Sequence, residues 1–418
     1  MNKDSFKVIF RTLKYKNYRL FFTGQSISLI GTWIQIIAAS WLIYRLTNSA
    51  FLLGLLTFAG QLPTLLFTPF AGVMVDRWDR YKLIKTTQIL FAFQSLIFGV
   101  LVLTEIIQIW HIIILNIFGG FVMAFDSPVR QSFVVDIVED KKDIGNAVAL
   151  NSMLFNMARM VGPAIAGILV AMIGEGWCFI INTITFLGII VNLHLMDIKK
   201  TILKKSNNHV LTDLKEGFLY TYNFLPIRYI LIILAFVSIV GMSMNVLMPI
   251  YTKDILLGDS KVLGFLMSSL GIGSLVGGVK LATKDSPKGL EKNIFWATII
   301  FGLSLIILPI FHNFLYAMLI MLFIGFGMIS QIISSNTMIQ SLVDDDKRGR
   351  VMGIYSMSFM GTAPIGSLFA GTLSGLIGVM NTSIIAGACC ILAGLYFLSK
   401  IRIISKIAED TYVKNVNL

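Results

Sequence analysis

The stretch Gly72-Val73-Met74-Val75-Asp76-Arg77-Trp78-Asp79-Arg80-Tyr81-Lys82 carries five charges in its last seven residues, between apolar runs at 51–75 and 83–104. Each run is long enough, at about 1.5 Å per residue, to cross a hydrocarbon layer about 30 Å thick. A charged loop of this kind stays out of lipid, so it marks where both helices end. Its basic residues predict a cytoplasmic position, because short basic loops are retained there.

The same alternation of long apolar run and short polar loop continues along the chain and predicts twelve membrane-spanning helices. Their expected ranges are 20–44, 51–75, 83–104, 110–133, 147–173, 177–196, 230–251, 262–281, 294–311, 314–342, 351–377 and 382–401. A polar stretch separates the first six from the last six. Within it, Leu211, Leu214 and Phe218 fall on one side of a helix that we expect to lie flat on the membrane surface.

The predicted fold is therefore all-α and integral to the membrane, with twelve transmembrane helices in two pseudo-symmetric halves. We expect five parts: an N-terminal interfacial helix at 1–19, a six-helix half at 20–196, a cytoplasmic linker with an amphipathic helix at 197–229, a second six-helix half at 230–404 and a cytoplasmic tail at 405–418. An internal repeat supports the two halves. Its matched pairs are Gly145 with Gly349, Gly162 with Gly366, and Gly167 with Gly371.

Composition and charge indicate a chain that is solvated by lipid. Of the 418 residues, 56% are hydrophobic and 13% are charged, half the charged share of about 25% in soluble domains. A net charge of +12 could indicate nucleic acid, but all except five of the 34 Lys and Arg lie in segments expected in the cytoplasm. The five exceptions are Arg45, Lys253 and Lys261 on the other side, and Arg130 and Arg159 within spans. The basic residues therefore set topology, with both termini inside.

Motifs of enzymes and metal proteins are not found in the sequence. Cys178, Cys389 and Cys390 lie in apolar spans without metal-ligand spacing, which is typical of core residues. A membrane-bound acyl or glycosyl transferase would need clustered His, Asp, Glu or metal ligands, and the four histidines are isolated. No Gly-x-x-x-x-Gly-Lys-Ser/Thr loop is present, so ATP could drive the protein only through a separate chain. We expect neither an enzyme nor a cofactor or metal.

The charged loop resembles the signature loop of the major facilitator superfamily, a family of secondary transporters. The matching residues are Gly72, Asp76, Arg77, Arg80 and Lys82. At Asp79 the family has a glycine, so this turn must form without a residue that favours positive φ. The resemblance implies a gating latch between the second and eleventh spans, with Asp76 facing the N-terminus of a helix that enters from the cytoplasm. The alternative is a solvated turn that only fixes topology.

The resemblance extends over nearly the whole chain to the branch that contains the enterobactin exporter and related bacterial efflux proteins. The run from Asp126 to Gly167 carries it, together with Gln25, Gly31, Thr32, Trp33 and Gln35 in the first span. Within that range, Gly162-Pro163-x-x-x-Gly167 is similar to the antiporter motif of the fifth span, although Ala166 stands where the motif has another glycine. The resemblance implies a multi-pass protein of the bacterial cytoplasmic (inner) membrane that works by alternating access.

Three charged side chains inside spans are the candidates for coupling. Asp126 and Arg130 are four residues apart, so they share a helix face and can pair, whereas Arg159 lies nearer mid-depth on the next span. A carboxylate at mid-membrane costs about 2.5–3.5 kcal/mol, so Asp126 needs a partner or a water-filled cavity. We expect all three in the transport path or its coupling switch. The alternative is a structural ion pair that braces the inner gate.

Neutral polar residues inside spans are candidates for the lining of a cavity, or for hydrogen bonds between helices. They are Gln25, Gln35, Gln61, Asn116, Asn151, Asn182, Asn245, Gln331 and Asn336. A passage with little fixed charge favours bulky or amphiphilic cargo, such as a siderophore or a lipophilic drug. Asn116 stands where many proton-coupled relatives have arginine, so proton coupling depends on the resemblance and on Asp126.

The sequence thus favours a proton-coupled exporter of an amphiphilic small molecule. An importer of an organic solute also fits, because direction is a property of the coupling. A sensor or scaffold of the same fold that no longer transports is a third reading, which the polar residues inside the spans argue against. The expected partners are a small-molecule substrate, protons and the lipid bilayer, without nucleic acid, and we expect a monomer.

Overall fold

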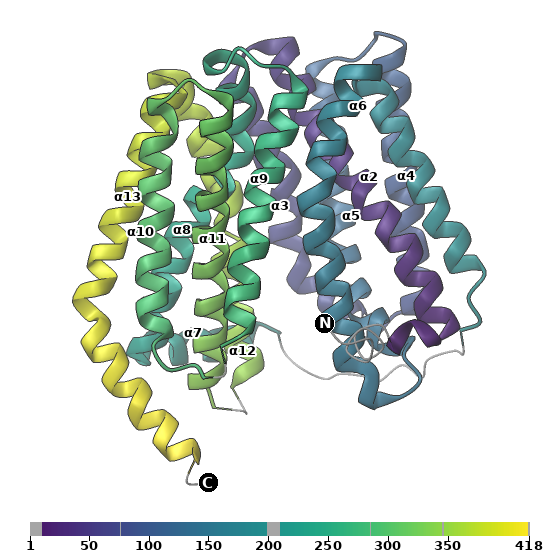
Figure 1. Ribbon diagram of the computed structural model, residues 1–418. Coiled ribbons are helices and arrows are strands. Elements are labelled where there is room, and N and C mark those ends of the chain that lie inside the picture. The colour runs from purple at the N-terminus through teal and green to yellow at the C-terminus, as the bar shows by residue number, and fades with distance from the viewer. Residues whose placement is uncertain (1–10, 76, 199–209, 285, 345–346, 417–418) are drawn as a thin grey trace. The chain divides into compact units, whose positions relative to one another are not determined.

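The computed structural model describes residues 11–75, 77–198, 210–284, 286–344 and 347–416, and within these ranges every regular element is a helix (Figure 1). In chain order the elements are η1 (Arg11–Lys14), α2 (Lys16–Thr47), α3 (Ala50–Val75), α4 (Arg80–Leu103), α5 (Ile109–Asp136), η2 (Lys141–Asp143), α6 (Ile144–His194), α7 (Val210–Asn223), α8 (Leu225–Ile250), η3 (Tyr251–Ile255), α9 (Ser260–Ala282), α10 (Leu290–Ile307), η4 (Leu308–Ile310), α11 (Phe314–Leu342), α12 (Arg348–Met360) and α13 (Ala363–Val416). The predicted all-α class is confirmed.

Ten helical segments in these ranges are long and apolar enough to cross a membrane. Two of the ten contain α6 and α13, which at 51 and 54 residues are about twice as long as one crossing requires. Each is interrupted by a glycine with non-helical angles, Gly174 (φ 81°, ψ 168°) and Gly378 (φ 83°, ψ 159°). Only glycine adopts this region readily. If α6 and α13 each cross the membrane twice, the ten apolar segments account for all twelve predicted spans.

The contacts of α2 show the direction of the second part of α6. Asn17 Nδ2, at the start of α2, donates to Asp197 O, just beyond the end of α6, at 2.8 Å. Arg45 Nε, near the end of α2, lies 2.8 Å from Oε1 of Glu175, which directly follows Gly174. The second part of α6 therefore runs antiparallel to α2.

The segment ahead of α2 shows where α6 begins. Lys14 Nζ and Tyr15 Oη lie 3.0 and 2.8 Å from Oδ2 of Asp143, the residue before α6. Helices α2 and α6 therefore start at the same end, and α6 crosses twice with a reversal at Gly174.

The carboxylate of Asp143 also holds the pKa of Lys14 above its ordinary value of 10.5, because it hydrogen-bonds the charged ammonium. A raised pKa stabilises the fold fully below the ordinary value, and this contribution is lost only as the pH rises through the raised value. The contact is therefore complete at neutral pH.

Only the second half of the interfacial helix predicted at 1–19 lies within the described residues. Residues 1–10 lie outside the described ranges, residues 11–14 form the short η1, and α2 already begins at Lys16. The last four residues of the predicted helix thus belong to α2, where Tyr18 is buried against residues such as Phe21 and Phe133.

Helix α13 reverses in the same way as α6. Ser383 Oγ, shortly after Gly378, donates to Leu305 O near the end of α10 at 2.8 Å. Ser405 Oγ donates to Glu291 Oε1 near the start of α10 at 3.0 Å. The part of α13 after Gly378 therefore runs antiparallel to α10, as Figure 1 shows.

The span predicted at 351–377 is not one continuous helix, and this prediction was wrong in that respect. Helix α12 ends at Met360, and α13 begins at Ala363, so 361–362 belong to neither. The break follows from Pro364, which has no N–H to donate to the Met360 carbonyl and so cannot continue α12. It occupies the first turn of α13 instead, where a missing N–H costs nothing.

Contacts between helices divide the chain into two compact units. The first comprises Met1–Thr47, Ala59–Asn207 and Asp259–Ser268, and the second comprises Asn48–Phe58, Asn208–Gly258 and Ser269–Leu418. Each unit includes a short segment from the other half of the sequence: the start of α9 in the first and the start of α3 in the second. The five-part division expected from the sequence stays a prediction.

Candidate functional site

A buried carboxylate with three donors is the most distinctive polar site of the first unit. Asp126, in α5, is fully buried. Thr87 Oγ1 and Gln88 Nε2, both from α4, lie 2.7 and 2.6 Å from Asp126 Oδ1. Arg130, one turn further along α5, forms an ion pair with Oδ2. Two neighbouring helices thus supply partners for both carboxylate oxygens.

These partners offset the cost of burying a charge at depth. Asp126 lies about 26 Å along α5 from Ile109 and about 15 Å before Asp136. A lone carboxylate in that position costs about 2.5–3.5 kcal/mol, and hydrogen bonds to a charged acceptor are stronger than neutral ones. The pairing that the four-residue spacing of Asp126 and Arg130 predicts is present. Its function stays a prediction.

Two atoms of this site have no hydrogen-bond partner within the described ranges, namely Arg130 Nε and Gln88 Oε1. The Arg130 side chain is also 16% exposed, whereas that of Asp126 is sealed. Arg130 thus keeps a donor that Asp126 does not use. The sequence analysis did not identify Thr87 and Gln88, because their role as donors to Asp126 depends on the packing of α4 against α5.

Arg159 stands apart from this site. It is half-buried in α6, and no hydrogen bond or ion pair joins it to another residue that the structure describes. Its neighbour Ala158 packs with Leu29 of α2 and with Leu154. The sequence analysis predicted the pairing of Asp126 with Arg130 and placed Arg159 with them only as a candidate for the transport path. A part for Arg159 in the transport path stays a prediction.

A chain of uncharged amides links four helices of the first unit. Asn182 Nδ2 of α6 donates to Gln35 Oε1 of α2 at 2.7 Å, and Gln35 Nε2 donates to Gln94 Oε1 of α4 at 3.2 Å. Gln94 Nε2 donates in turn to Leu115 O of α5 at 2.7 Å, while Thr185 Oγ1 lies 3.0 Å from Asn182 Oδ1. Gln94 was missed in the sequence, although a polar side chain inside an apolar span is the signal that identified Gln35.

The other predicted lining residues of the first unit do not join this chain. Gln25 is buried, and neither end of its amide bonds to a group in the described part of the protein. Asn116 donates to Ile112 O of its own helix at 2.8 Å. Gln61 and Asn151 are half-buried. Gln25 and Asn116 therefore differ from Gln35, which bridges helices.

The predicted polar residues of the second unit carry no charge. Gln331 Nε2 donates to Ser335 Oγ at 3.2 Å, and Asn336 Oδ1 accepts from Gln340 Nε2 at 2.5 Å, both within α11. Asn245 is half-buried in α8. Gln331 and Asn336 thus each make a hydrogen bond within α11.

The signature loop is described except at Asp76, so the predicted latch falls outside the described residues. Arg80 Nη1 lies 3.0 Å from Asp136 Oδ1 at the end of α5. Asp79 has φ −63° and ψ 107° and caps α4, accepting from the N–H of Lys82 at 3.2 Å. An extended N-cap with a carboxylate acceptor explains how the loop forms without a glycine at this position.

The other residues that match the signature motif are Gly72, Arg77 and Lys82. Gly72 is half-buried near the end of α3, with open space where a Cβ would stand. Arg77 is exposed in the turn and the Lys82 side chain is exposed at the start of α4. Their contribution to gating stays a prediction.

The glycines of the antiporter-like motif lie at contacts between helices of the first unit. A Cβ at Gly162 would overlap the Trp33 side chain of α2, and one at Gly167 would overlap the Ser260 carbonyl at the start of α9. Pro163 lies between them inside an α6 that continues as a helix. Close packing explains both glycines, and bending at Pro163 stays a prediction.

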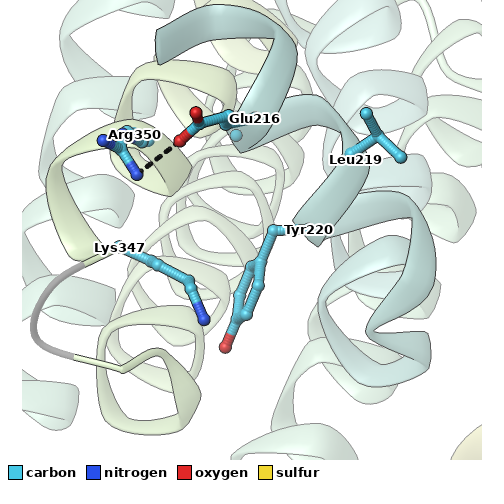
Figure 2. Close-up of a pocket in the computed structure, with 6 residues that line it drawn as sticks. Glu216, Leu219, Tyr220, Lys347 and Arg350 are labelled. Carbon is cyan, nitrogen blue, oxygen red and sulfur yellow. Dashed lines mark ion pairs between the residues drawn. The ribbon is translucent and has the colours of Figure 1, made fainter.

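The second unit has a pocket of about 250 Å³ where α7 meets the start of α12, and Figure 2 shows residues that line it. Glu216 Oε2 lies 2.8 Å from Arg350 Nη1, and the Lys347 ammonium lies 4.8 Å from the centre of the Tyr220 ring. The linker helix is thus docked on α12. Phe218, from the predicted apolar side of the linker helix, is 62% exposed. The side chains of Leu211 and Leu214 lie outside the described residues.

The described residues contain no group of three His, Cys, Asp or Glu side chains placed to hold a metal ion. The predicted core cysteines Cys178 and Cys390 are buried and Cys389 is half-buried, all as free thiols.

The sequence of this chain is similar to those of known bacterial transporters. The family model described as transmembrane secretion effector matches residues 9–416. The chain is 26% identical to the staphyloferrin A transporter of Staphylococcus aureus, over 91% of this chain and 96% of that protein. It is 24% identical to the multidrug efflux pump Tap of Mycolicibacterium fortuitum, over 89% and 93% of the two chains. With macrolide efflux protein A of Streptococcus pyogenes the identity is 21%, over 90% and 95%.

Solved transporter structures share the fold. The nucleoside transporter NupG matches with a TM-score of 0.72 and 13% identity, over 93% of this chain and 99% of that one. A bacterial homologue of the iron transporter ferroportin matches with a TM-score of 0.71 and 15% identity, over 92% and 98%. Identities this low support the architecture and leave the cargo open.

Proposed function

Because the chain belongs to the transmembrane secretion effector family of the major facilitator superfamily, we propose that it exports an amphiphilic small molecule in exchange for protons. That the protein is a multi-pass membrane transporter follows from the family and from its efflux and siderophore relatives. The direction, the coupling ion and the class of cargo are the further steps of the proposal.

The buried Asp126 site is the observation that carries the proton step. Its carboxylate is held by Arg130, Thr87 and Gln88, so protonation would remove the charge that binds Arg130. Arg130 has a further donor at Nε that finds no partner among the described groups. A change of partner for Arg130 would couple one proton to one rearrangement of α5. Such a discrete two-state element is what alternating access requires.

The amide chain supports the choice of cargo. Gln35, Gln94 and Asn182 supply uncharged donors and acceptors between apolar helices of the first unit. A solute with an apolar body and several neutral polar groups could exchange hydrogen bonds with them, whereas a small, highly charged solute would lack counter-charges. The relative named macrolide efflux protein A supports this choice, because a macrolide is a bulky amphiphilic molecule.

The rest of the mechanism follows the superfamily pattern. We infer that both termini face the cytoplasm, that Asp76 latches its loop to the eleventh span, and that the Gly162-Pro163 region of the fifth span bends or slides during the cycle. The expected active form is a monomer.

Transport in inside-out membrane vesicles with an imposed pH gradient, acid inside, tests the proposal. Candidate siderophores and macrolides serve as cargo, and a protonophore collapses the gradient. We expect Asp126→Asn to lower gradient-driven uptake at least tenfold, because the variant cannot exchange a proton at this site. Gradient-free counterflow of the cargo should persist, since it needs no net proton movement.

Glu216→Gln provides the control. Glu216 is a carboxylate of α7 outside the predicted spans, 55% exposed and paired with Arg350. We expect this variant to keep most of the uptake. Wild-type uptake by Asp126→Asn would remove Asp126 from the coupling step, and accumulation only in right-side-out vesicles would make the protein an importer.

A further inference from the structure

The second unit carries a surface groove that the proposed transport cycle does not use. It lies between α8 and the part of α13 that follows Gly378, and it has a volume of about 390 Å³. Its lining is apolar and aromatic and includes Tyr229, Ile232, Phe236, Leu392, Tyr396 and Phe397. Several of these side chains are exposed, among them Leu392 at 66% and Phe236 at 46%. In a helix that crosses a membrane, such a surface faces acyl chains.

One end of the groove is framed by cations over aromatic rings. The Arg228 guanidinium carbon lies 5.2 Å from the ring centres of both Tyr222 and Tyr229. The Lys400 ammonium lies 5.7 Å from the Tyr396 ring, and the rings of Tyr229 and Tyr396 meet edge to face at 6.2 Å. Each basic residue therefore lies over one ring of the tyrosine pair that begins the groove.

Both cations have donors to spare. Arg228 Nη1 donates to Tyr222 O at 3.4 Å, and neither Arg228 nor Lys400 forms an ion pair with a carboxylate of the described residues. A guanidinium presents five N–H donors in a planar fork that suits phosphate. Tyr, Lys and Arg at the end of an apolar helix also mark the level of lipid headgroups.

We propose that this groove binds an anionic phospholipid, with its negatively charged headgroup at the end that carries Arg228 and Lys400 and an acyl chain between α8 and α13. From Tyr229 to Phe236 the groove extends about 10 Å along α8, enough for part of one chain. A zwitterionic lipid would bring its own cation to the same end, where it would repel Arg228 and Lys400. The site therefore selects lipids of net negative charge.

Native mass spectrometry of the full-length protein, released from detergent, tests the site directly and independently of transport. The probes are phosphatidylglycerol and phosphatidylcholine with identical acyl chains. We expect the first bound lipid to favour phosphatidylglycerol at least fivefold. The double variant Arg228→Gln/Lys400→Gln should lose about fivefold in phosphatidylglycerol affinity for each cation removed, and Arg228→Lys should keep most of it.

Two further variants separate the headgroup from the chain. Ala393→Trp places a large ring in the groove and should lower binding of both lipids. Lys280→Gln is the control, because Lys280 lies 5.3 Å from the Phe326 ring but outside the groove, and it should bind as the wild type does. Thermal midpoints in detergent confirm that each variant is folded. Equal affinity for the two lipids, wild-type binding by the double variant or by Ala393→Trp, or a dimer that excludes lipid would each overturn the proposal.

Discussion

At the scale of single residues, the buried charges differ from the exposed ones in what their loss would cost. The Asp126 side chain is fully buried against Arg130, whereas Glu216 and Arg350 are 55% and 36% exposed. Removing one partner of a buried pair costs about 3–5 kcal/mol, since it leaves an uncompensated charge. An exposed pair contributes about 0–1 kcal/mol.

We therefore predict that Arg130→Ala lowers the thermal midpoint in detergent clearly, while Glu216→Gln changes it little. The double variant Asp126→Asn/Arg130→Ala should recover part of the loss, because the carboxylate that lacked a partner is neutral. A double variant no more stable than Arg130→Ala would show that Thr87 and Gln88 alone satisfy Asp126.

Arg159 gives a second prediction at this scale. It lies half-buried in α6 without an ion-pair partner in the described ranges, so its removal breaks no salt bridge there. We expect Arg159→Ala to abolish transport in the vesicle assay while the amount of protein in the membrane is unchanged, as a blot of the same vesicles measures. Normal transport by this variant would leave Arg159 a packing role only.

At the scale of elements, two glycines allow two long helices to fold back. Gly174 and Gly378 have open space around the α-carbon, so their backbone angles rather than crowding require glycine. A side chain in this region costs about 1–3 kcal/mol.

Gly174→Ala should therefore destabilise the protein by about that amount, measured by denaturant or thermal unfolding in detergent. Gly188→Ala is the matched control in the same α6. It is helical, with nothing within contact distance of an added Cβ, and a gain of up to about 1 kcal/mol in helix propensity is expected. Equal effects of the two substitutions would contradict the backbone explanation.

The docking of α7 on α12 gives a prediction that separates packing from charge. A Cβ at Gly217 would lie 3.1 Å from the Arg350 Cβ, so the two helices touch at that glycine. We expect Gly217→Leu to increase hydrogen–deuterium exchange across α7, and Glu216→Gln to leave it nearly unchanged, since the ion pair is exposed. If the second variant loosens α7 as much as the first, charge rather than packing holds the linker.

At the scale of the whole molecule, the distribution of basic residues predicts the orientation. The loop between α4 and α5 should face outward, and the loop between α9 and α10 should face the cytoplasm. In a background without native cysteines, we expect Glu105→Cys to react with an impermeant thiol reagent in intact cells. Lys288→Cys should react only in inside-out vesicles. The reverse pattern would invert the topology.

Much of the architecture could be predicted because lipid imposes local rules. Each crossing must satisfy its backbone within one continuous helix, so length and apolarity identify the spans, and short basic loops assign their sides. The pairing of Asp126 with Arg130 was predictable for the same reason, since both lie on one helix face. The predicted span at 351–377 failed only where Pro364 interrupts it.

Only the tertiary structure decided which polar side chains form hydrogen bonds between helices. Thr87 and Gln88 reach Asp126, and Gln94 joins Gln35 to Leu115, because of the register between α2, α4 and α5. That register depends on the packing of side chains far apart in the chain, which no local pattern encodes. Hydropathy and charge along the sequence therefore determined a bundle of twelve crossings, while packing determined which polar groups share an interior.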